Sequence, residues 1–357
     1  MNPTSLELLQ EKIRANDLDS LLITKGLNTR YLTGFDGESA GTVISRSGLS
    51  LFVNSLYIEY ARATVSPLFE IREMREGVFD LFSSLGNEFW GKRVGFEADG
   101  VTFSFHGKLS EALKTAATIP CEGMVEEFRE RKRPGEIEAM RKAQRIAEQA
   151  FREVLPLVRE GVEERELALE VDYRLRGLGG ERSAFDTIVA SGPNTSRPHA
   201  IPSNRKIAGG DLVLFDLGTV VDGYASDMTR TVVLGKADAR QRQVYHTVLE
   251  AQENALAGIT AGMKCADADQ LARQVIERAG FGKEFVHTLG HGVGLEVHES
   301  PRLSSRSEAV LQPGTVVTVE PGIYLPDWGG IRIEDMVVVT ESGCDNLTEA
   351  PKELMEL

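Results

Sequence analysis

Two patterns of apolar and polar residues follow one another along the chain, and the change comes near residue 130. Before it, short apolar segments alternate with helical stretches, which is typical of an α/β domain, here residues 1–130. The charged stretch 126–136 includes Pro134-Gly135 and indicates a linker followed by the start of a helix. Residues 131–357 then form a second domain. The apolar segments of the first domain lie at 21–23, 42–44 and 49–53.

The second domain shows the same order of predicted elements twice. Two helices, each with apolar residues on one face, are followed by two strands, and this order then recurs. Such a repeat predicts a duplicated α+β unit, although an α+β domain without duplication can give the same order. The predicted helices begin near Glu136 and lie at 167–178, 244–255 and 268–279, and the predicted strands lie at 211–217, 229–234, 315–320 and 331–339.

Composition and charge narrow the range of functions. The formal net charge of −14 argues against a nucleic-acid or anionic-membrane surface, because both favour Lys and Arg. No apolar run is long enough to span a bilayer, and the first ten residues lack the pattern of a signal peptide. Cys121, Cys265 and Cys344 lie far apart, so neither a disulfide framework nor a thiolate metal site is expected. We therefore expect a cytoplasmic protein without nucleic-acid or membrane partners.

Each predicted strand pair carries two acidic residues. The first pair has Asp216 and Asp227, and the second has Glu320 and Glu334. Asp216 and Glu320 end runs of apolar residues, where a carboxylate must lose its water. That loss is costly unless the carboxylate is paired or bound to a metal. His291 lies between the two pairs, in the glycine-rich segment Leu289-Gly-His-Gly-Val-Gly-Leu-Glu-Val-His-Glu.

Four carboxylates and one imidazole form an oxygen-rich ligand set that suits manganese, our first choice, or else cobalt or zinc. Their four negative charges match two divalent cations. At an effective dielectric constant near 20, each pair of like charges ~4 Å apart costs about 4 kcal/mol, so the cluster without metal would be strained or protonated. Two ions ~3.5–4 Å apart can hold a bridging hydroxide and clamp a carbonyl oxygen.

Other interpretations of these residues need weighing. A single Asp after a strand is usually a turn residue or a helix cap, and a single His is usually structural. Here, however, four of the six histidines lie in or near the acidic motifs: His199, His287, His291 and His298. The glycine-rich segment does not suit a helix that presents both His287 and His291, and it lacks the third glycine of the dinucleotide-binding fingerprint. No second histidine completes a HExxH motif after His298, so a thermolysin-like zinc site is not expected.

The motifs around these residues resemble the pita-bread metallopeptidases, the family of prolidase, aminopeptidase P and methionine aminopeptidase. The resemblance covers about Lys132 to Thr348 and all five ligand positions. It implies an α+β fold with a pita-bread catalytic domain at 131–357 and a smaller, creatinase-like α/β domain at 1–130. The matching runs start at Phe215 (Phe-Asp-Leu-Gly), Gly223 (Gly-Tyr-Ala-Ser-Asp-Met-Thr-Arg-Thr), Leu289, Val319 (Val-Glu-Pro-Gly-Ile-Tyr) and Gly330 (Gly-Ile-Arg-Ile-Glu-Asp).

The first domain resembles the N-terminal domain of prolidases and creatinase through Tyr31-Leu-Thr-Gly-Phe and Gly95-Phe-Glu. Relatives often carry an Asp-x-Arg-Tyr run where this chain has Asn54-Ser-Leu-Tyr. That departure leaves open which contacts the first domain makes with the site.

The resemblance also implies a role for each ligand. Asp216 would chelate the first metal ion, and Asp227 and Glu334 would bridge both ions. His291 and Glu320 would hold the second ion, and Glu320 would also relay the proton of the attacking water. The residues expected to support the ligands are Arg332 and Thr229.

Further residues are expected to contact the substrate. His199 and His298 would contact the scissile carbonyl and the tetrahedral intermediate. His287, Arg302 and Arg332 are the remaining predicted substrate contacts. Arg302 suits the free carboxylate of a product proline, because a guanidinium pairs with a carboxylate through two parallel hydrogen bonds.

The implied activity is hydrolysis of the Xaa-Pro peptide bond by a metal-bridging hydroxide. An Xaa-Pro dipeptidase is the first choice, an aminopeptidase acting on longer peptides is the alternative, and a non-catalytic peptide-binding module is the rival from another class. The full set of five ligands favours the hydrolase, and the N-terminal domain argues against methionine aminopeptidase. The expected partners are a proline-containing peptide and a second copy of the chain in a homodimer.

Overall fold

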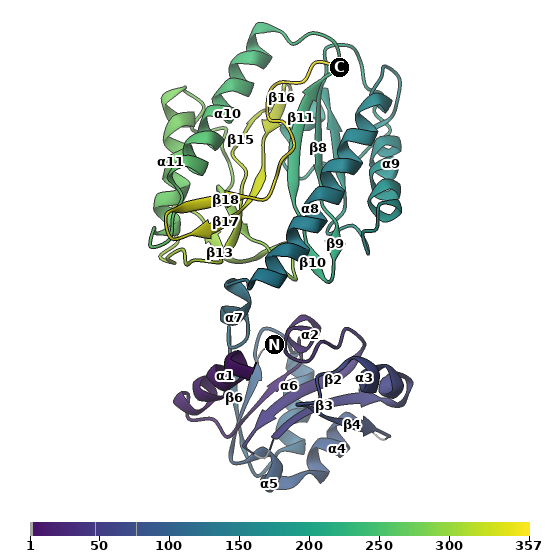
Figure 1. The fold of residues 1–357 in the computed structure, drawn as a ribbon, viewed down its shortest axis with the longest axis vertical. Coiled ribbons are helices and arrows are strands. Elements are labelled where there is room, and N and C mark those ends of the chain that lie inside the picture. The colour runs from purple at the N-terminus through teal and green to yellow at the C-terminus, as the bar shows by residue number, and fades with distance from the viewer. Residues whose placement is uncertain (1–2, 47, 76) are drawn as a thin grey trace. The chain divides into compact units, whose positions relative to one another are not determined.

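The computed structural model describes residues 3–46, 48–75 and 77–357, and the chain divides into two compact units, Met1–Arg129 and Glu130–Leu357. Figure 1 shows both units, and each is described by itself below. Within the described ranges, no helix has both the length and the apolar character needed to cross a membrane.

The first unit is built on a six-stranded sheet with the strand order β4-β3-β2-β1-β5-β6. The three predicted apolar segments are its strands β1, β2 and β3, which pair antiparallel, whereas the outer pairs are parallel. The strands are β1 Ser20–Ile23, β2 Ser39–Ser45, β3 Gly48–Asn54, β4 Glu70–Met74, β5 Arg93–Glu97 and β6 Ala117–Cys121. The helices are α1 Pro3–Ala15, α2 Gly26–Thr33, η1 Ser55–Tyr57, α3 Ile58–Thr64, α4 Val78–Ser84, α5 Gly86–Trp90, α6 Phe103–Ala112 and α7 Glu126–Glu130.

The second unit contains the four predicted helices, in two pairs. Each buries the apolar face that its sequence predicts, as Met140, Ala143 and Ala147 do on the first of them. That helix begins with Pro134, and the side chain of Glu136 accepts a hydrogen bond from the backbone N–H of Arg133, which caps the first turn. The helices are α8 Pro134–Val154, η2 Leu155–Leu157, α9 Glu164–Gly177, η3 Gly192–Ser196, α10 Ala239–Gly258 and α11 Cys265–Arg278.

The strands of the second unit repeat one arrangement. Along the chain, the small antiparallel ribbon β9–β10 lies between the paired strands β8 and β11. In the same way, the ribbon β15–β16 lies between the paired strands β14 and β17. A helix pair precedes each arrangement, which agrees with the predicted duplicated unit. The strands are β7 Ile188–Ser191, β8 Leu212–Leu217, β9 Val220–Val221, β10 Tyr224–Ala225, β11 Met228–Val233, β12 Gly290–Gly292, β13 Glu299–Leu303, β14 Val316–Val319, β15 Gly322–Leu325, β16 Gly329–Arg332, β17 Asp335–Thr340 and β18 Gly343–Asn346.

Each helix pair packs on the strands of its own half. One buried cluster joins α8 and α9 to β8 and β11 and includes Phe151 and Phe215. A second joins α10 and α11 to β14 and β17 and includes Val248 and Val337. Figure 1 shows the two helix pairs on either side of the strands. The strand ends that carry the acidic residues are thereby supported by a packed core.

One sequence prediction about the strands is wrong. Residues 331–339 were expected to form one strand, but they contribute to two, β16 and β17, which belong to different sheets. Ile333 and Glu334 lie between these strands and are both buried. The sequence alternates apolar and polar residues from Ile331 to Glu334 and continues with the apolar run 336–339, which is the pattern of one continuous strand and does not reveal the break.

Candidate metal centre

The four predicted acidic ligands lie at corresponding places on the two strand pairs. Asp216 is the penultimate residue of β8, and Asp227 immediately precedes β11, where Thr229 pairs with Asp216. Glu320 immediately follows β14, and Glu334 immediately precedes β17. In each half, antiparallel pairing therefore brings together two acids that are distant in sequence.

The fifth predicted ligand, His291, lies in the middle of β12, between strands that approach it unusually closely. A Cβ atom built on Gly290 would lie 2.0 Å from the carbonyl oxygen of Thr318, and one built on Gly292 would lie 2.1 Å from that of Ser300. Only glycine fits at either position. The two glycines therefore permit the backbone packing that fixes the imidazole over the acids.

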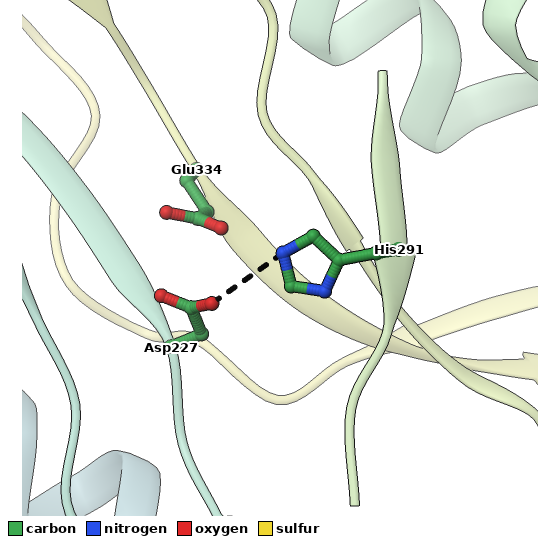
Figure 2. Close-up of side chains that lie close together, drawn as sticks. All are labelled: Asp227, His291 and Glu334. Atoms are coloured by element: carbon green, nitrogen blue, oxygen red, sulfur yellow. Dashed lines mark ion pairs between the residues drawn. The ribbon is translucent and has the colours of Figure 1, made fainter. Parts of the chain in front are cut away.

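Figure 2 shows the side chains of Asp227, His291 and Glu334 converging from three separate segments of the chain. One ligand atom from each lies within 4.8 Å of the others. The Nε2 atom of His291 is 3.7 Å from the nearer carboxylate oxygen of Asp227 and 3.3 Å from that of Glu320. Asp216 belongs to the same group, because Arg332 donates both to it and to Thr229, whose hydroxyl donates to Glu334. The structure thus brings all five predicted ligands into one cluster.

The imidazole of His291 is oriented as a metal ligand would need to be. Its Nδ1 atom lies 3.1 Å from the carbonyl oxygen of Gly292, which can only accept, so Nδ1 carries the proton. A metal ion would therefore bind through Nε2, the atom that faces the acids; without metal, Nε2 carries a second proton and donates to Glu320. A backbone carbonyl commonly fixes the tautomer of a metal-binding histidine in this way.

The two carboxylate oxygens of Asp216 differ in their hydrogen bonding. Its Oδ2 atom accepts a hydrogen bond of 2.6 Å from Arg332, whereas its buried Oδ1 atom has no hydrogen-bond partner. A buried carboxylate oxygen without a partner is costly, and a cation would satisfy it. The donor set therefore fits a divalent metal ion.

The electrostatics of the cluster support the same conclusion. Burial, together with the neighbouring carboxylates, raises the pKa of Asp227 and of Glu334 well above their ordinary values. Burial also acts to raise the pKa of Glu320, but the hydrogen bond and charge of His291 outweigh it and lower that pKa to about 2. Four carboxylates so close together repel one another, and divalent cations would offset this repulsion.

Arg332 and Thr229 hydrogen-bond the acids, as expected for residues that support the ligands. The buried guanidinium of Arg332 donates to Asp216, to the hydroxyl of Thr229 at 2.9 Å and to that of Tyr324 at 2.8 Å. The Thr229 hydroxyl in turn donates to Glu334 at 2.7 Å. Arg332 thus orients one ligand directly and another through Thr229, and its predicted substrate contact stays a prediction.

Two residues of the centre were not singled out from the sequence. The hydroxyl of Tyr324 links Arg332 to His287, whose Nε2 atom lies 2.9 Å from it. The fully buried Arg230 donates to the carbonyl oxygen of Glu334 at 2.6 Å and to the carboxylate of Asp335 at 2.8 Å. The signals available for them were a tyrosine in the motif Pro-Gly-Ile-Tyr and a charged arginine within the strand Met-Thr-Arg-Thr-Val-Val, which is buried along its whole length.

Three of the remaining predicted substrate contacts, His199, His298 and Arg302, are more exposed than the acids. The rings of His298 and His291 have centroids 4.3 Å apart. Arg302 pairs with His291 across β12 and β13, and directly opposed residues in a ladder project from the same face. Partial burial lowers the pKa of His298, and the charges of Arg302 and His199 contribute in the same direction. All three are exposed.

His287 differs from these three residues. It is half-buried, and both of its ring nitrogens are engaged within the protein. Nδ1 donates to the carbonyl oxygen of Thr288, so Nε2 accepts from Tyr324. Its predicted substrate contact stays a prediction.

Comparison with known proteins gives a consistent result. Residues 138–341 match metallopeptidase family M24, and residues 6–131 match the creatinase/prolidase N-terminal domain. An Xaa-Pro dipeptidase of Pyrococcus furiosus is 37% identical over 98% of this chain and 99% of its own length. The solved Xaa-Pro dipeptidase of Bacillus anthracis is 38% identical, with a TM-score of 0.96 and 99% coverage of both chains.

An X-Pro aminopeptidase of Thermotoga maritima is similar as well, at 36% identity and a TM-score of 0.88, over 96% of this chain and 98% of its own. The similarity extends along both units, and the M24 match alone covers more than half of the 357 residues. The predicted fold and family are confirmed: the chain belongs to metallopeptidase family M24 and carries a creatinase/prolidase N-terminal domain.

Proposed function

We propose that the protein hydrolyses the Xaa-Pro peptide bond with two divalent cations held by Asp216, Asp227, His291, Glu320 and Glu334. The observation that carries this proposal is the convergence of acids from two strand pairs on the Nε2 side of His291. The names of the relatives, which include Xaa-Pro dipeptidases, support the choice of substrate. A non-catalytic peptide-binding module remains the rival, and it predicts no turnover.

Bound cations would polarise the scissile carbonyl and lower the pKa of the attacking water. Glu320 is suited to move the proton, because it is only partly buried, whereas Asp227 and Glu334 are buried. Its carboxylate is held by a hydrogen bond of 3.1 Å from the Thr318 hydroxyl. It would take the proton from the water and pass it to the proline nitrogen, which must be protonated to leave. His298 and His199 would donate to the carbonyl oxygen as negative charge develops there.

We expect His298→Ala to lower kcat by roughly 10²–10³-fold while it changes KM much less. The assigned hydrogen bond strengthens only as charge develops on the carbonyl oxygen, so its loss destabilises the transition state more than the bound substrate. Steady-state kinetics on an Xaa-Pro dipeptide measure both constants. A variant in which only KM rises would show that His298 merely binds substrate.

Among Xaa-Pro peptidases, we propose a dipeptidase, with an aminopeptidase acting on longer peptides as the alternative. A dipeptidase must recognise the free carboxylate of proline. Arg302 is exposed and lies opposite His291 on the same face of the β12–β13 ladder, so its guanidinium can reach a substrate at the cluster. Relatives carry both names, so the metal centre itself does not distinguish the two activities.

The metal-loaded enzyme is expected to cleave an Xaa-Pro dipeptide roughly 10- to 100-fold faster than its C-terminal amide, because one charge-assisted interaction is lost with the amide. Arg302→Ala should remove most of this preference. Arg306→Ala, in the loop beyond β13, is a matched control and should leave the preference intact. A panel of Xaa-Pro dipeptides and Xaa-Pro-Yaa tripeptides with several divalent metals makes the comparison. Equal or faster turnover of the tripeptides would establish the aminopeptidase.

We further propose manganese as the native metal, with cobalt or zinc as alternatives, because the ligands are mostly carboxylates. The three free cysteines are consistent with a reducing cytoplasm, which we propose as the location. Proline-containing peptides are the proposed partners, rather than nucleic acid or membranes, and the net charge of −14 supports this choice. A homodimer is proposed from the family resemblance.

A further inference from the structure

Lys132 and Glu299 form an ion pair that is almost completely removed from solvent. Their charged atoms lie 3.3 Å apart, and their side chains are 1% and 6% exposed. Withdrawing two such charges from water costs several kcal/mol per ion, and mutual attraction does not always recover it. A buried ion pair of this kind therefore need not stabilise the fold. Its location beside the turn that carries His298 suggests another role.

The carboxylate of Glu299 closes the turn that follows β12. Its Oε1 atom accepts a hydrogen bond of 3.0 Å from the backbone N–H of Glu296, and the N–H of Gly294 donates to the carbonyl oxygen of Glu296 at 2.9 Å. A Cβ atom on Gly294 would lie 2.5 Å from Glu299 Oε2. The missing side chain at Gly294 therefore makes room for the carboxylate inside the turn.

This turn carries His298, the residue next to Glu299. It begins just after His291 and ends at β13, so its shape determines where the His298 ring lies relative to the metal centre. The ring of His298 is exposed, yet its centroid is only 4.3 Å from that of His291. The backbone of the turn, rather than enclosure by other side chains, must hold an exposed ring in that place.

Lys132 is held in place by the backbone around it, so its ammonium has a fixed position beside the Glu299 carboxylate. Its backbone N–H donates to Gly314 O at 2.8 Å, and Arg131 forms a bridge with Thr315 next to β14. Its ammonium also donates to the carbonyl oxygen of Glu130 at 3.3 Å. The segment that precedes α8 is thereby held against the strand β14, and it presents the ammonium to the turn.

We propose that Lys132 and Glu299 are positioning residues for His298: their buried ion pair fixes the turn 294–299 so that the imidazole meets the scissile carbonyl. This inference rests on the proposed function. Neither residue touches the substrate, and their effect on catalysis passes through the position of His298. Because misplacing a reacting group by about 1 Å can cost roughly 10²-fold in rate, a small shift of the turn suffices.

The test is a double-mutant cycle between Glu299→Gln and His298→Ala, with kcat and KM measured on an Xaa-Pro dipeptide. Glutamine keeps the shape of Glu299 and an acceptor for Glu296, but it removes the charge that pairs with Lys132. We expect Glu299→Gln to lower kcat by about 10-fold or more in the otherwise wild-type enzyme. In the His298→Ala background it should cause little further loss, because the positioned group is already absent.

Asp211→Asn is the matched control. The Asp211 carboxylate also joins a cation to a backbone N–H, at 2.6 Å from Arg205 and 2.8 Å from the N–H of Ala208. It immediately precedes β8, near the end of the strand away from Asp216. This variant should lower the melting temperature without lowering kcat.

Each outcome of the double-mutant cycle either supports or contradicts the positioning role of Glu299 and Lys132. If Glu299→Gln lowers kcat equally in both backgrounds, or not at all, the positioning role is wrong and the pair is structural. If that variant does not fold, Lys132→Met enters the same cycle with the same expectation. Manganese titration should find the wild-type number of bound ions in every folded variant. A metal-loaded wild-type enzyme that never cleaves Xaa-Pro dipeptides would overturn the proposed function and this inference together.

Discussion

Replacing Glu320 by Gln should lower kcat on an Xaa-Pro dipeptide by at least about 10²–10⁴-fold, the usual contribution of a general acid–base group. The carboxylate is proposed to bind a metal ion and to carry the proton from the attacking water to the proline nitrogen. An amide can do neither well, although it has nearly the same shape. Its hydrogen bond from Thr318 can persist, so the fold should be retained.

The measurement is single-turnover kinetics with elemental analysis of the same sample. Glu341→Gln, an exposed residue after β17, serves as the matched control and should have wild-type rates. A Glu320→Gln variant that is fully loaded with metal and turns over at a near-normal rate would contradict the proton-transfer role. A variant that only loses metal would show that Glu320 is a ligand without showing that it moves protons.

Asp227→Asn should raise the melting temperature of the metal-free protein and lower that of the metal-loaded protein. Without metal, the variant should melt at a higher temperature than wild type, because a buried carboxylate that repels its neighbours is replaced by a neutral group. With saturating manganese the order should reverse, since the wild-type site binds the folded state more tightly. Turnover should fall by more than the roughly 10–100-fold that is typical for groups that only hydrogen-bond a ligand.

Thermal melts of both proteins, with chelator and with manganese, make this comparison. Asp211→Asn removes a carboxylate that is paired with Arg205 outside the cluster, and it should destabilise under both conditions. If Asp227→Asn destabilised the protein equally with and without metal, the carboxylate would be structural, and the bridging role would be lost.

The sequence predicted the four long helices of the second unit because each buries one face, and it located the main strands because they are runs of mostly apolar, buried residues. The five ligands could be named because Asp216 and Glu320 end apolar runs, and because the motifs around all five resemble those of the pita-bread metallopeptidases. Their convergence was harder to predict, since it depends on how the halves meet. The hydrogen bond from Thr229 to Glu334 and the ion pair between Arg230 and Asp335 each join residues 105 positions apart in the sequence.

The residues that sequence analysis missed are buried polar groups whose partners lie far along the chain. Tyr324 and Arg230 lie in buried strands, and only the folded structure supplies Arg332 and Glu334 as their partners. The break between β16 and β17 was hidden for a related reason. The alternation of apolar and polar residues from Ile331 to Glu334 is typical of a single strand, and Glu334 is buried by partners that only the folded structure supplies.

The central claim is that this chain is an Xaa-Pro peptidase that needs two divalent ions. The most direct measurement is a titration of metal-free protein with manganese, in which bound ions per chain and hydrolysis of an Xaa-Pro dipeptide are followed together. The account predicts that turnover is absent without metal and reaches its maximum as the second ion binds. Binding that never exceeds one ion at full activity, or turnover that survives complete removal of metal, would contradict it.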